Sequence, residues 1–394
     1  MNRSFYIACL IGLSAASFAG SDWAMLSRYQ NSITASTFNH LLNGVFSPDG
    51  GMLPHLRYDD QSVSVYSSIA QTGTPLLQLR FAEEDAPAPP RKKLVGLHVA
   101  LDPGHIGGAW ARMEERFFLV DRQRDWPVQE AALNLYVARL IRDRLAAVGA
   151  TVSLVKNDFE PMSKPGPDER LKIAGTPGPP DPRFSHLPDL FVLSSQLDAQ
   201  RKLVEREFFR TAEITARAGL VNNTIRPDLT LCIHFNATGY GDEKTLYEEN
   251  GLAFFVHGNY LANELIDDEQ KFFLLKKMLE RSHETEAGLA NAVASAFIQA
   301  TQLPPAYRVA SGGPMHPLGS NAYVYARNLA ANRQYDGPVL FLEPYFMNNR
   351  DVYARIQAGD YDGEREINGR RYRSLFKEYA EAVVAGVVNY FRTP

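Results

Sequence analysis

Two histidines and one glutamate in this sequence could together hold a metal ion. His105 follows the apolar run 95–101 in a glycine-containing turn, His234 ends the apolar run 229–234, and Glu130 lies between them in the chain. Two neutral imidazoles and one carboxylate suit zinc, and three protein ligands leave a fourth position open for water, as in catalytic sites. A zinc ion held in this way polarises water and a carbonyl group for hydrolysis.

The carboxylate ligand is predicted from the start of a helix. Residues 127–148 have Pro127 in the first turn, an apolar stripe on one face and Gly149 as a stop, which predicts a helix with Glu130 in its first turn. In open α/β sheets, ligands bind at the carboxyl ends of the strands, and the helix after the first strand begins at that edge. We therefore expect Glu130 to meet both imidazoles there.

A second carboxylate is predicted to act as the general base and general acid of the reaction. Glu343 directly follows the apolar run 338–342, and an uncompensated buried carboxylate is costly. Beside an activated water it can accept a proton during attack and return it to a leaving nitrogen, as a general base and then a general acid. Each residue alone has a simpler interpretation as a turn, helix-dipole or solvated residue. Their arrival from four segments at one edge favours a hydrolytic metal site.

The order of elements predicts the fold class. Apolar strand-like runs alternate with helical patterns at 95–101, 151–155, 229–234, 252–256, 322–325 and 338–342. This alternation predicts an α/β domain with a largely parallel sheet covered by helices on both faces.

The chain is predicted to contain several units. Residues 1–19 have the pattern of a secretory signal peptide, so we expect an exported, periplasmic or extracellular protein in which Cys9 is removed. Residues 22–83 form a small α+β N-terminal module, and the proline-rich stretch 84–93 forms a linker. Residues 94–394 form the catalytic domain, with insertions near 157–205 and 259–277. The second insertion is also consistent with a helix packed on the core.

The bulk composition argues against one class of partner. The formal net charge is -4 over 394 residues and the pI is about 6.2. There is no dense run of Lys and Arg, so a nucleic-acid partner is not expected.

Four blocks of the sequence resemble the zinc-dependent N-acetylmuramoyl-L-alanine amidases of the amidase 3 type. The blocks are Leu101-Asp102-Pro103-Gly104-His105, Glu130-Ala131-Ala132-Leu133-Asn134-Leu135, Asp228 through Ala237 with the preceding helical segment 210–218, and Val339 through Asn349. The resemblance covers roughly residues 94–394. It implies a twisted six-stranded sheet flanked by helices, zinc as the cofactor and peptidoglycan as the substrate.

Some positions depart from the family pattern. Ile106 stands where the family has a second glycine, and the interval between His105 and Glu130 is longer than usual, which leaves Glu114 and Glu115 as alternative ligands. Cys232, which replaces a serine of the family, is interpreted as a small buried residue rather than a fourth ligand.

The leading hypothesis is an exported zinc amidase that cuts between N-acetylmuramic acid and the first L-alanine of the stem peptide. The alternatives are a zinc peptidase or amidase for another acyl amide, and a wall-binding protein without activity.

Other parts of the chain have predicted roles outside the chemistry. The N-terminal module could bind the wall or an activator protein, and the insertions could gate the cleft. The protein is expected to be a monomer. His316 is a further candidate at the rim of the site, and Asp102 and Asn236 are candidates for orienting the ligand loops.

Overall fold

The computed structural model describes residues 22–87, 92–175, 189–239, 243–309 and 312–392, leaving aside the side chains of 189–192. The predicted signal peptide at 1–19, with Cys9, and residues 88–91 of the predicted linker lie outside the described residues. Among the described helices, none combines the length and the apolar composition that crossing a membrane requires.

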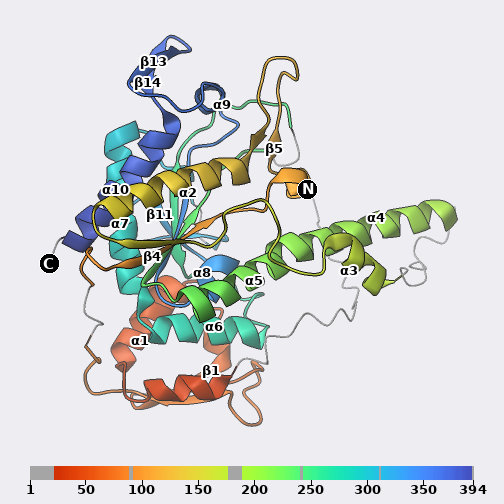
Figure 1. The fold of residues 1–394 in the computed structure, drawn as a ribbon. Helices are drawn as coiled ribbons and strands as arrows, with labels where there is room; N and C mark the ends of the chain where they lie inside the picture. Colours follow the sequence, from red (N-terminus) through yellow and green to blue (C-terminus); the bar gives the residue numbers. More distant parts are fainter. Residues whose placement is uncertain (1–21, 88–91, 176–188, 240–242, 310–311, 393–394) are drawn as a thin grey trace.

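A seven-stranded mixed sheet forms the centre of the protein, in the order β10-β11-β9-β12-β8-β4-β7 (Figure 1). The strands are β4 (His98–Pro103), β7 (Thr151–Leu154), β8 (Leu229–Ile233), β9 (Leu252–His257), β10 (His316–Pro317), β11 (Val324–Arg327) and β12 (Val339–Pro344). Neighbouring strands are parallel except for the pairs β10–β11 and β12–β9. The mostly parallel α/β fold is thus confirmed. The sheet has seven strands rather than six because it includes β10, whose two residues are too few to show a periodic pattern.

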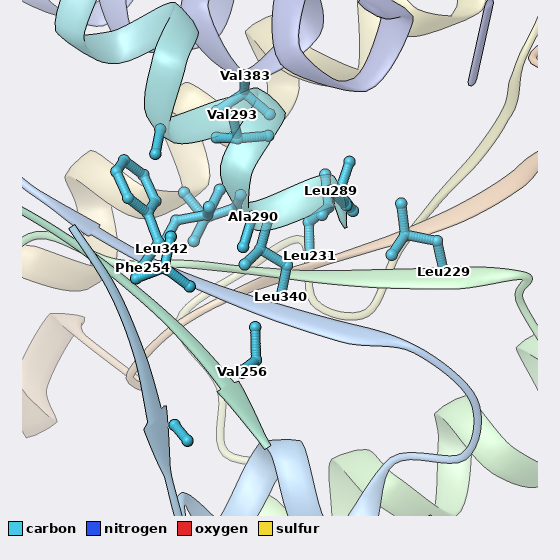
Figure 2. Close-up of a cluster of buried hydrophobic side chains, with 14 of the residues drawn as sticks. Leu229, Leu231, Phe254, Val256, Leu289, Ala290, Val293, Leu340, Leu342 and Val383 are labelled. Carbon is cyan, nitrogen blue, oxygen red and sulfur yellow. The ribbon is translucent and has the colours of Figure 1, made fainter. Parts of the chain in front are cut away.

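Helices cover both faces of the sheet. One face packs against α2 (Glu130–Ala147), α7 (Ser282–Thr301) and α10 (Leu375–Arg392). Figure 2 shows side chains of α7, including Leu289 and Ala290, above Leu340 and Leu342 of β12, and Val383 of α10 beside Val293 of α7. The other face packs against α5 (Glu213–Leu220) and α8 (Ala330–Gln334). Since both faces are covered, every residue of β8 is buried, and all of them except Thr230 are apolar, without the alternation of a half-exposed strand.

The N-terminal region is a small α+β unit. It contains η1 (Trp23–Tyr29), α1 (Ala35–Leu41), η2 (Leu42–Phe46), η3 (Leu53–His55) and an antiparallel sheet of β1 (Leu56–Tyr58), β2 (Ser62–Val65) and β3 (Leu77–Arg80). Its buried side chains, including Phe38 and Phe46, belong to the same hydrophobic cluster as the core beside the large sheet. The N–H groups of Asn259 and Tyr260 also donate to the carbonyls of Val45 and Phe46, at 2.7 Å each. The division at 84–93 stays a prediction.

The two predicted insertions contain helices. Within 157–205 lie α3 (Pro167–Ala174) and most of α4 (Asp189–Glu207), which continues through η6 (Phe208–Ala212) into α5 and then η7 (Val221–Ile225). Figure 1 shows α4 extending away from the sheet. Its Leu193, Leu197 and Leu203 are exposed, so it lacks the single buried apolar stripe from which a helix is recognised in sequence. Within 259–277 begins α6 (Asp268–Leu279), which buries Phe272 and Phe273 against the core.

The remaining elements are short or lie near the carboxyl terminus. They are η4 (Gly108–Trp110), the two-stranded sheet β5 (Phe117–Phe118) and β6 (Val128–Gln129), α9 (Arg350–Gln357), and the hairpin β13 (Glu364–Ile367) and β14 (Arg370–Arg373). The β5–β6 pair lies between His105 and Glu130 in the chain, and it accounts for part of their long separation in sequence.

Shortening a core leucine tests which contacts stabilise this arrangement. Leu340 in β12 is fully buried, so Leu340→Ala should lower the free energy of unfolding by about 2–5 kcal/mol through lost burial and a residual cavity. Leu197→Ala in α4 is the matched control, since that side chain is 44% exposed, and it should change stability by less than about 0.5 kcal/mol. Denaturant unfolding measures both variants, and equal shifts would contradict the assignment of the core.

Candidate metal centre and catalytic cleft

The turn after β4 brings His105 and His234 together. Gly104 lies so close to His234 that an added Cβ atom would fall 1.9 Å from the His234 ring. Only glycine fits there. His105 itself has a φ of +67°, a left-handed conformation that is unfavourable for residues other than glycine. Surrounding contacts must therefore hold this turn in place.

Arg217 of α5 supplies most of these contacts. Its guanidinium is buried and donates to the carbonyls of Pro103, at 2.9 Å, and His105, at 2.7 Å. It also pairs with Asp102 at 2.9 Å and with Glu213 at 3.0 Å. These carboxylates raise the pKa of Arg217 even though its burial acts in the opposite direction. Arg217 therefore stays charged and ties α5 to the end of β4.

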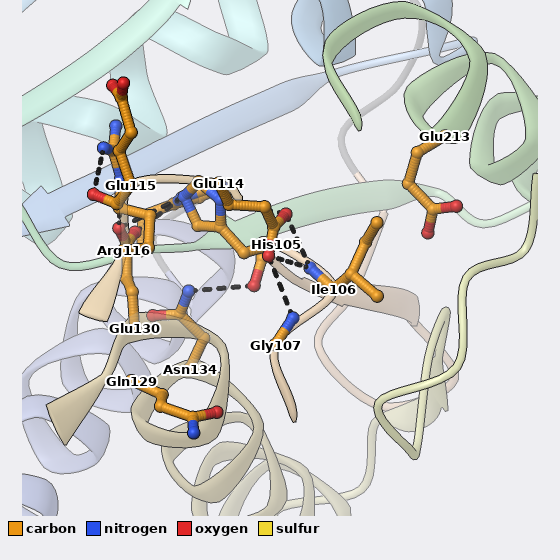
Figure 3. A network of polar contacts seen from close by, with 12 residues as sticks. His105, Ile106, Gly107, Glu114, Glu115, Arg116, Gln129, Glu130, Asn134 and Glu213 are labelled. Carbon is orange, nitrogen blue, oxygen red and sulfur yellow. Dashed lines mark hydrogen bonds and ion pairs between the residues drawn. The ribbon is translucent and has the colours of Figure 1, made fainter. Parts of the chain in front are cut away.

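His105, Glu130 and His234 meet at the carboxyl edge of β4 and β8. Each offers one ligand atom, and these atoms lie within 4.8 Å of one another. Glu130 contacts His105 Nε2 through Oε2 at 3.1 Å and His234 Nδ1 through Oε1 at 3.0 Å. Figure 3 shows His105 and Glu130 in this network. The structure thus brings together the three residues predicted as ligands, and two imidazoles with a carboxylate are a donor set that fits a divalent metal.

The charges at this cluster compensate one another. Burial disfavours the charged form of His105, but Glu130 and Glu114 outweigh it and raise the pKa of the imidazole to about 9. Burial likewise disfavours ionised Glu130, yet His105, His234 and Arg116 hold its pKa well below the usual range. Arg116 Nε lies 2.8 Å from Glu130 Oε2. Without a metal, Glu130 is therefore ionised and His105 carries a proton.

Glu114, an alternative ligand in the sequence, has a different position. Its carboxylate accepts hydrogen bonds from the N–H groups of Ile106, at 2.9 Å, and Gly107, at 3.0 Å (Figure 3). Its Oε1 also lies 3.5 Å from His105 Nδ1, on the opposite side of the ring from Glu130. Glu114 can thus orient the imidazole and increase its basicity. Glu115, the other alternative, is exposed and lies outside the cluster.

Glu343 lines the same cleft. It lies in β12, beside β8, and the cleft is also lined by Arg116, Arg327 and Phe341. Burial and the nearby charge of Glu130 raise the pKa of Glu343 to about 7, although Arg327, Arg116 and His105 partly oppose this. A carboxyl group with this pKa can both accept and donate a proton near neutral pH.

The other residues considered from the sequence have different positions. Cys232 is fully buried under the site, and burial raises the pKa of its thiol well above the ordinary value. His316 lies in β10 at the edge of the sheet and does not line the cleft. Asp102 accepts from Arg217 and from the Tyr335 hydroxyl, and its role in orienting the ligand loop stays a prediction. Asn236 accepts from the Ala237 N–H and donates to the Tyr307 hydroxyl.

Sequence reasoning missed Arg116, Arg217 and Arg327, and it assigned no role to Glu114 beyond that of an alternative ligand. Arg217 and Glu213 are four residues apart on one helix, a spacing typical of ion pairs, but that spacing gives no indication of contact with β4.

One protein-family model matches this chain, and several solved structures are similar to it. The model of the Amidase_3 family, described as N-acetylmuramoyl-L-alanine amidase, matches residues 99–367. The N-acetylmuramyl-L-alanine amidase Ami1 from Mycobacterium abscessus, in its apo form, is 17% identical, with a TM-score of 0.40 over 75% of this chain and 99% of that one. The CwlD amidase from Clostridioides difficile, solved in complex with the GerS lipoprotein, is 13% identical, with a TM-score of 0.40 over 76% of this chain and 100% of that one.

A further solved structure, the catalytic domain of the amidase CwlV from Bacillus (Paenibacillus) polymyxa var. colistinus, is 15% identical, with a TM-score of 0.39 over 76% of this chain and 99% of that one. No curated protein sequence matches. The family match spans more than half of the chain and contains all four predicted site residues. The protein therefore belongs to the Amidase_3 family of N-acetylmuramoyl-L-alanine amidases.

Proposed function

We propose that this amidase hydrolyses the bond between N-acetylmuramic acid and L-alanine with a zinc ion held by His105, Glu130 and His234, and with Glu343 as general base and acid. The observation that carries the proposal is the cluster of three ligand atoms within 4.8 Å of one another, in a cleft that Glu343 also lines. Zinc is the metal that this donor set suits, and when bound it polarises water and the substrate carbonyl.

Glu343 transfers a proton from the attacking water to the leaving group in this mechanism. Its ionised carboxylate accepts a proton from the attacking water, and the resulting carboxyl group gives that proton to the nitrogen of the leaving L-alanine. The raised pKa of Glu343, about 7, suits both steps. Partial burial also keeps bulk water from competing for that proton.

The neighbouring residues position the ligands. Glu114 contacts His105 Nδ1 and orients the ring, while Arg217 holds the backbone on either side of Gly104. Asn134 donates to the Gly104 carbonyl at 3.1 Å from the same helix that carries Glu130. A rigid ligand set reduces the reorganisation needed when substrate binds.

Location and partners are part of the proposal. The family's cell-wall substrate supports action in the periplasm or outside the cell, after export directed by residues 1–19. Binding of the wall or an activator protein through residues 22–83, gating by the insertions, and a monomeric state stay predictions.

Metal removal tests the proposed function directly. Purified protein should release peptides with a free L-alanine amino terminus from peptidoglycan, and chelator treatment should abolish this release because the ligand cluster would lose its metal. Adding zinc back should restore it. Mass spectrometry of the soluble products identifies the bond that is cut. Release that continues undiminished in chelator would exclude a metal mechanism.

Two conservative substitutions separate proton transfer from metal binding. Glu343→Gln should lower kcat by about 10²–10⁴-fold, as expected for a lost general base, and should keep the bound zinc. Glu130→Gln should instead lose most of the zinc, because it removes the anionic ligand. Kinetics and metal analysis of the same preparations measure both properties. An active Glu343→Gln variant would disprove the assigned role of Glu343.

Zinc affinity should depend on the proton that His105 carries. Since the pKa of His105 is raised to about 9 in the metal-free protein, zinc must displace this proton below that pH. Affinity should therefore rise with pH and level off near 9, with about one proton released per zinc at pH 7.5. Calorimetry in two buffers with different ionisation enthalpies measures this release.

Glu114→Gln provides the control for this measurement. It removes one of the two carboxylates that raise the pKa of His105, so its affinity should level off at a lower pH. A pH-independent affinity in the unchanged protein would contradict the charge assignment.

A further inference from the structure

A row of stacked side chains crosses the sheet from the metal cluster to Arg327. The His234 ring stacks on Phe341 with ring centroids 4.2 Å apart, and Phe341 meets Phe255 edge to face at 6.3 Å. The guanidinium carbon of Arg327 lies 5.4 Å from the centroid of the Phe255 ring. His234 directly follows β8, and Phe341, Phe255 and Arg327 lie in β12, β9 and β11, which are the next strands of the sheet in this order.

Arg327 is a cation in the cleft that forms no ion pair with any of the described residues. It lines the cleft together with Glu343 and His234 and is partly buried. Within the described part of the chain, its side chain has the contact with Phe255 but no hydrogen bond or ion pair. By contrast, Arg217 at the inner end of the cleft is paired with two carboxylates. A partly desolvated guanidinium is costly unless it has a hydrogen-bonded anion, and a carboxylate matches its geometry best.

Arg327 is set apart from the proposed metal ligands, although its charge helps to lower the pKa of Glu343. Two aromatic rings separate it from His234, which is one of the proposed ligands. An anion bound to Arg327 would thus belong to a part of the substrate several bonds away from the scissile amide. Arg327 would thus bind a part of the substrate that does not itself react.

We propose that Arg327 binds a free carboxylate of the stem peptide and so directs the peptide side of the substrate along the sheet towards β9 and β11. This inference rests on the proposed function. The carboxyl group of N-acetylmuramic acid is consumed in the scissile amide, so the glycan bears no free carboxylate. The anion that pairs with Arg327 must lie on the peptide. The glycan then leaves the cleft on the other side of the metal cluster.

The test compares two substrates and three variants. A muramoyl peptide with free carboxylates and the same peptide with those groups amidated are hydrolysed by the zinc-loaded protein. Arg327→Gln should raise KM for the carboxylate substrate by roughly 10- to 100-fold, as expected for the loss of a charge-assisted hydrogen bond. It should leave the amidated substrate nearly unchanged. Arg327→Lys keeps the charge and should recover part of the preference.

Arg365→Gln is the matched control. Arg365 also stacks on an aromatic ring, that of Tyr361, but it lies in the β13–β14 hairpin, away from the cleft. Its variant should keep the substrate preference of the unchanged protein. The proposal is overturned if Arg327→Gln raises KM equally for both substrates, or for neither. Equal loss would show that Arg327 acts on Glu343 or on folding instead of on the peptide.

Binding measurements distinguish this inference from the proposed function. Calorimetry with zinc-loaded Glu343→Gln, with and without Arg327→Gln, measures affinity for both peptides without turnover. If the unchanged protein hydrolyses neither peptide but binding depends on Arg327 and on the carboxylates, then the catalytic proposal alone fails. If hydrolysis occurs and binding does not depend on Arg327, then the carboxylate proposal alone fails.

Discussion

The buried ion pairs of Arg217 are the constraint on which the rest of the site depends. One guanidinium binds Asp102, Glu213 and two backbone carbonyls of the turn that carries His105. Burying these charges is costly, and removing one partner of a buried pair typically costs about 3–5 kcal/mol because the other charge is left unpaired. The arrangement is stable only when all partners are present. It can therefore hold His105 in the left-handed conformation from which its ring contacts Glu130.

The same network connects the site with the first insertion. The carboxylate of Glu213 accepts hydrogen bonds from the N–H groups of Met162 and Ser163, at 2.8 and 2.9 Å. These two residues belong to the stretch 157–205, and Lys156, directly before it, donates to the Ile106 carbonyl at 2.8 Å. The base of the insertion and the turn after β4 are thus connected through the ion pair of Glu213 and Arg217. A movement at this base would disturb the backbone beside His105 before it affected the core of the sheet.

The four residues proposed for chemistry could be predicted because they follow the simplest rule of the fold. His105, His234 and Glu343 end or follow strands that run in the same direction, and Glu130 begins the helix after the first of them. Parallel strands bring their carboxyl ends to one edge, so sequence order was enough to place these groups together. The charged residues around them follow no such rule. Glu114 and Arg116 belong to an irregular segment, and its path depends on tertiary contacts.

Arg327 shows most clearly why part of the cleft lay beyond sequence reasoning. β9 is antiparallel to β12 and parallel to β11, so β11 ends at the opposite edge of the sheet from the metal cluster. In the register of the sheet, Arg327 pairs with His257, whereas Glu343 pairs with Ala253 four residues earlier in β9. The rule that strand ends meet at one edge would therefore exclude Arg327 from the site. Its guanidinium reaches the cleft because the long side chain lies over Phe255. The reversal of direction between β12 and β9 thus adds a cation to the cleft on the far side of Phe255 and Phe341 from His234.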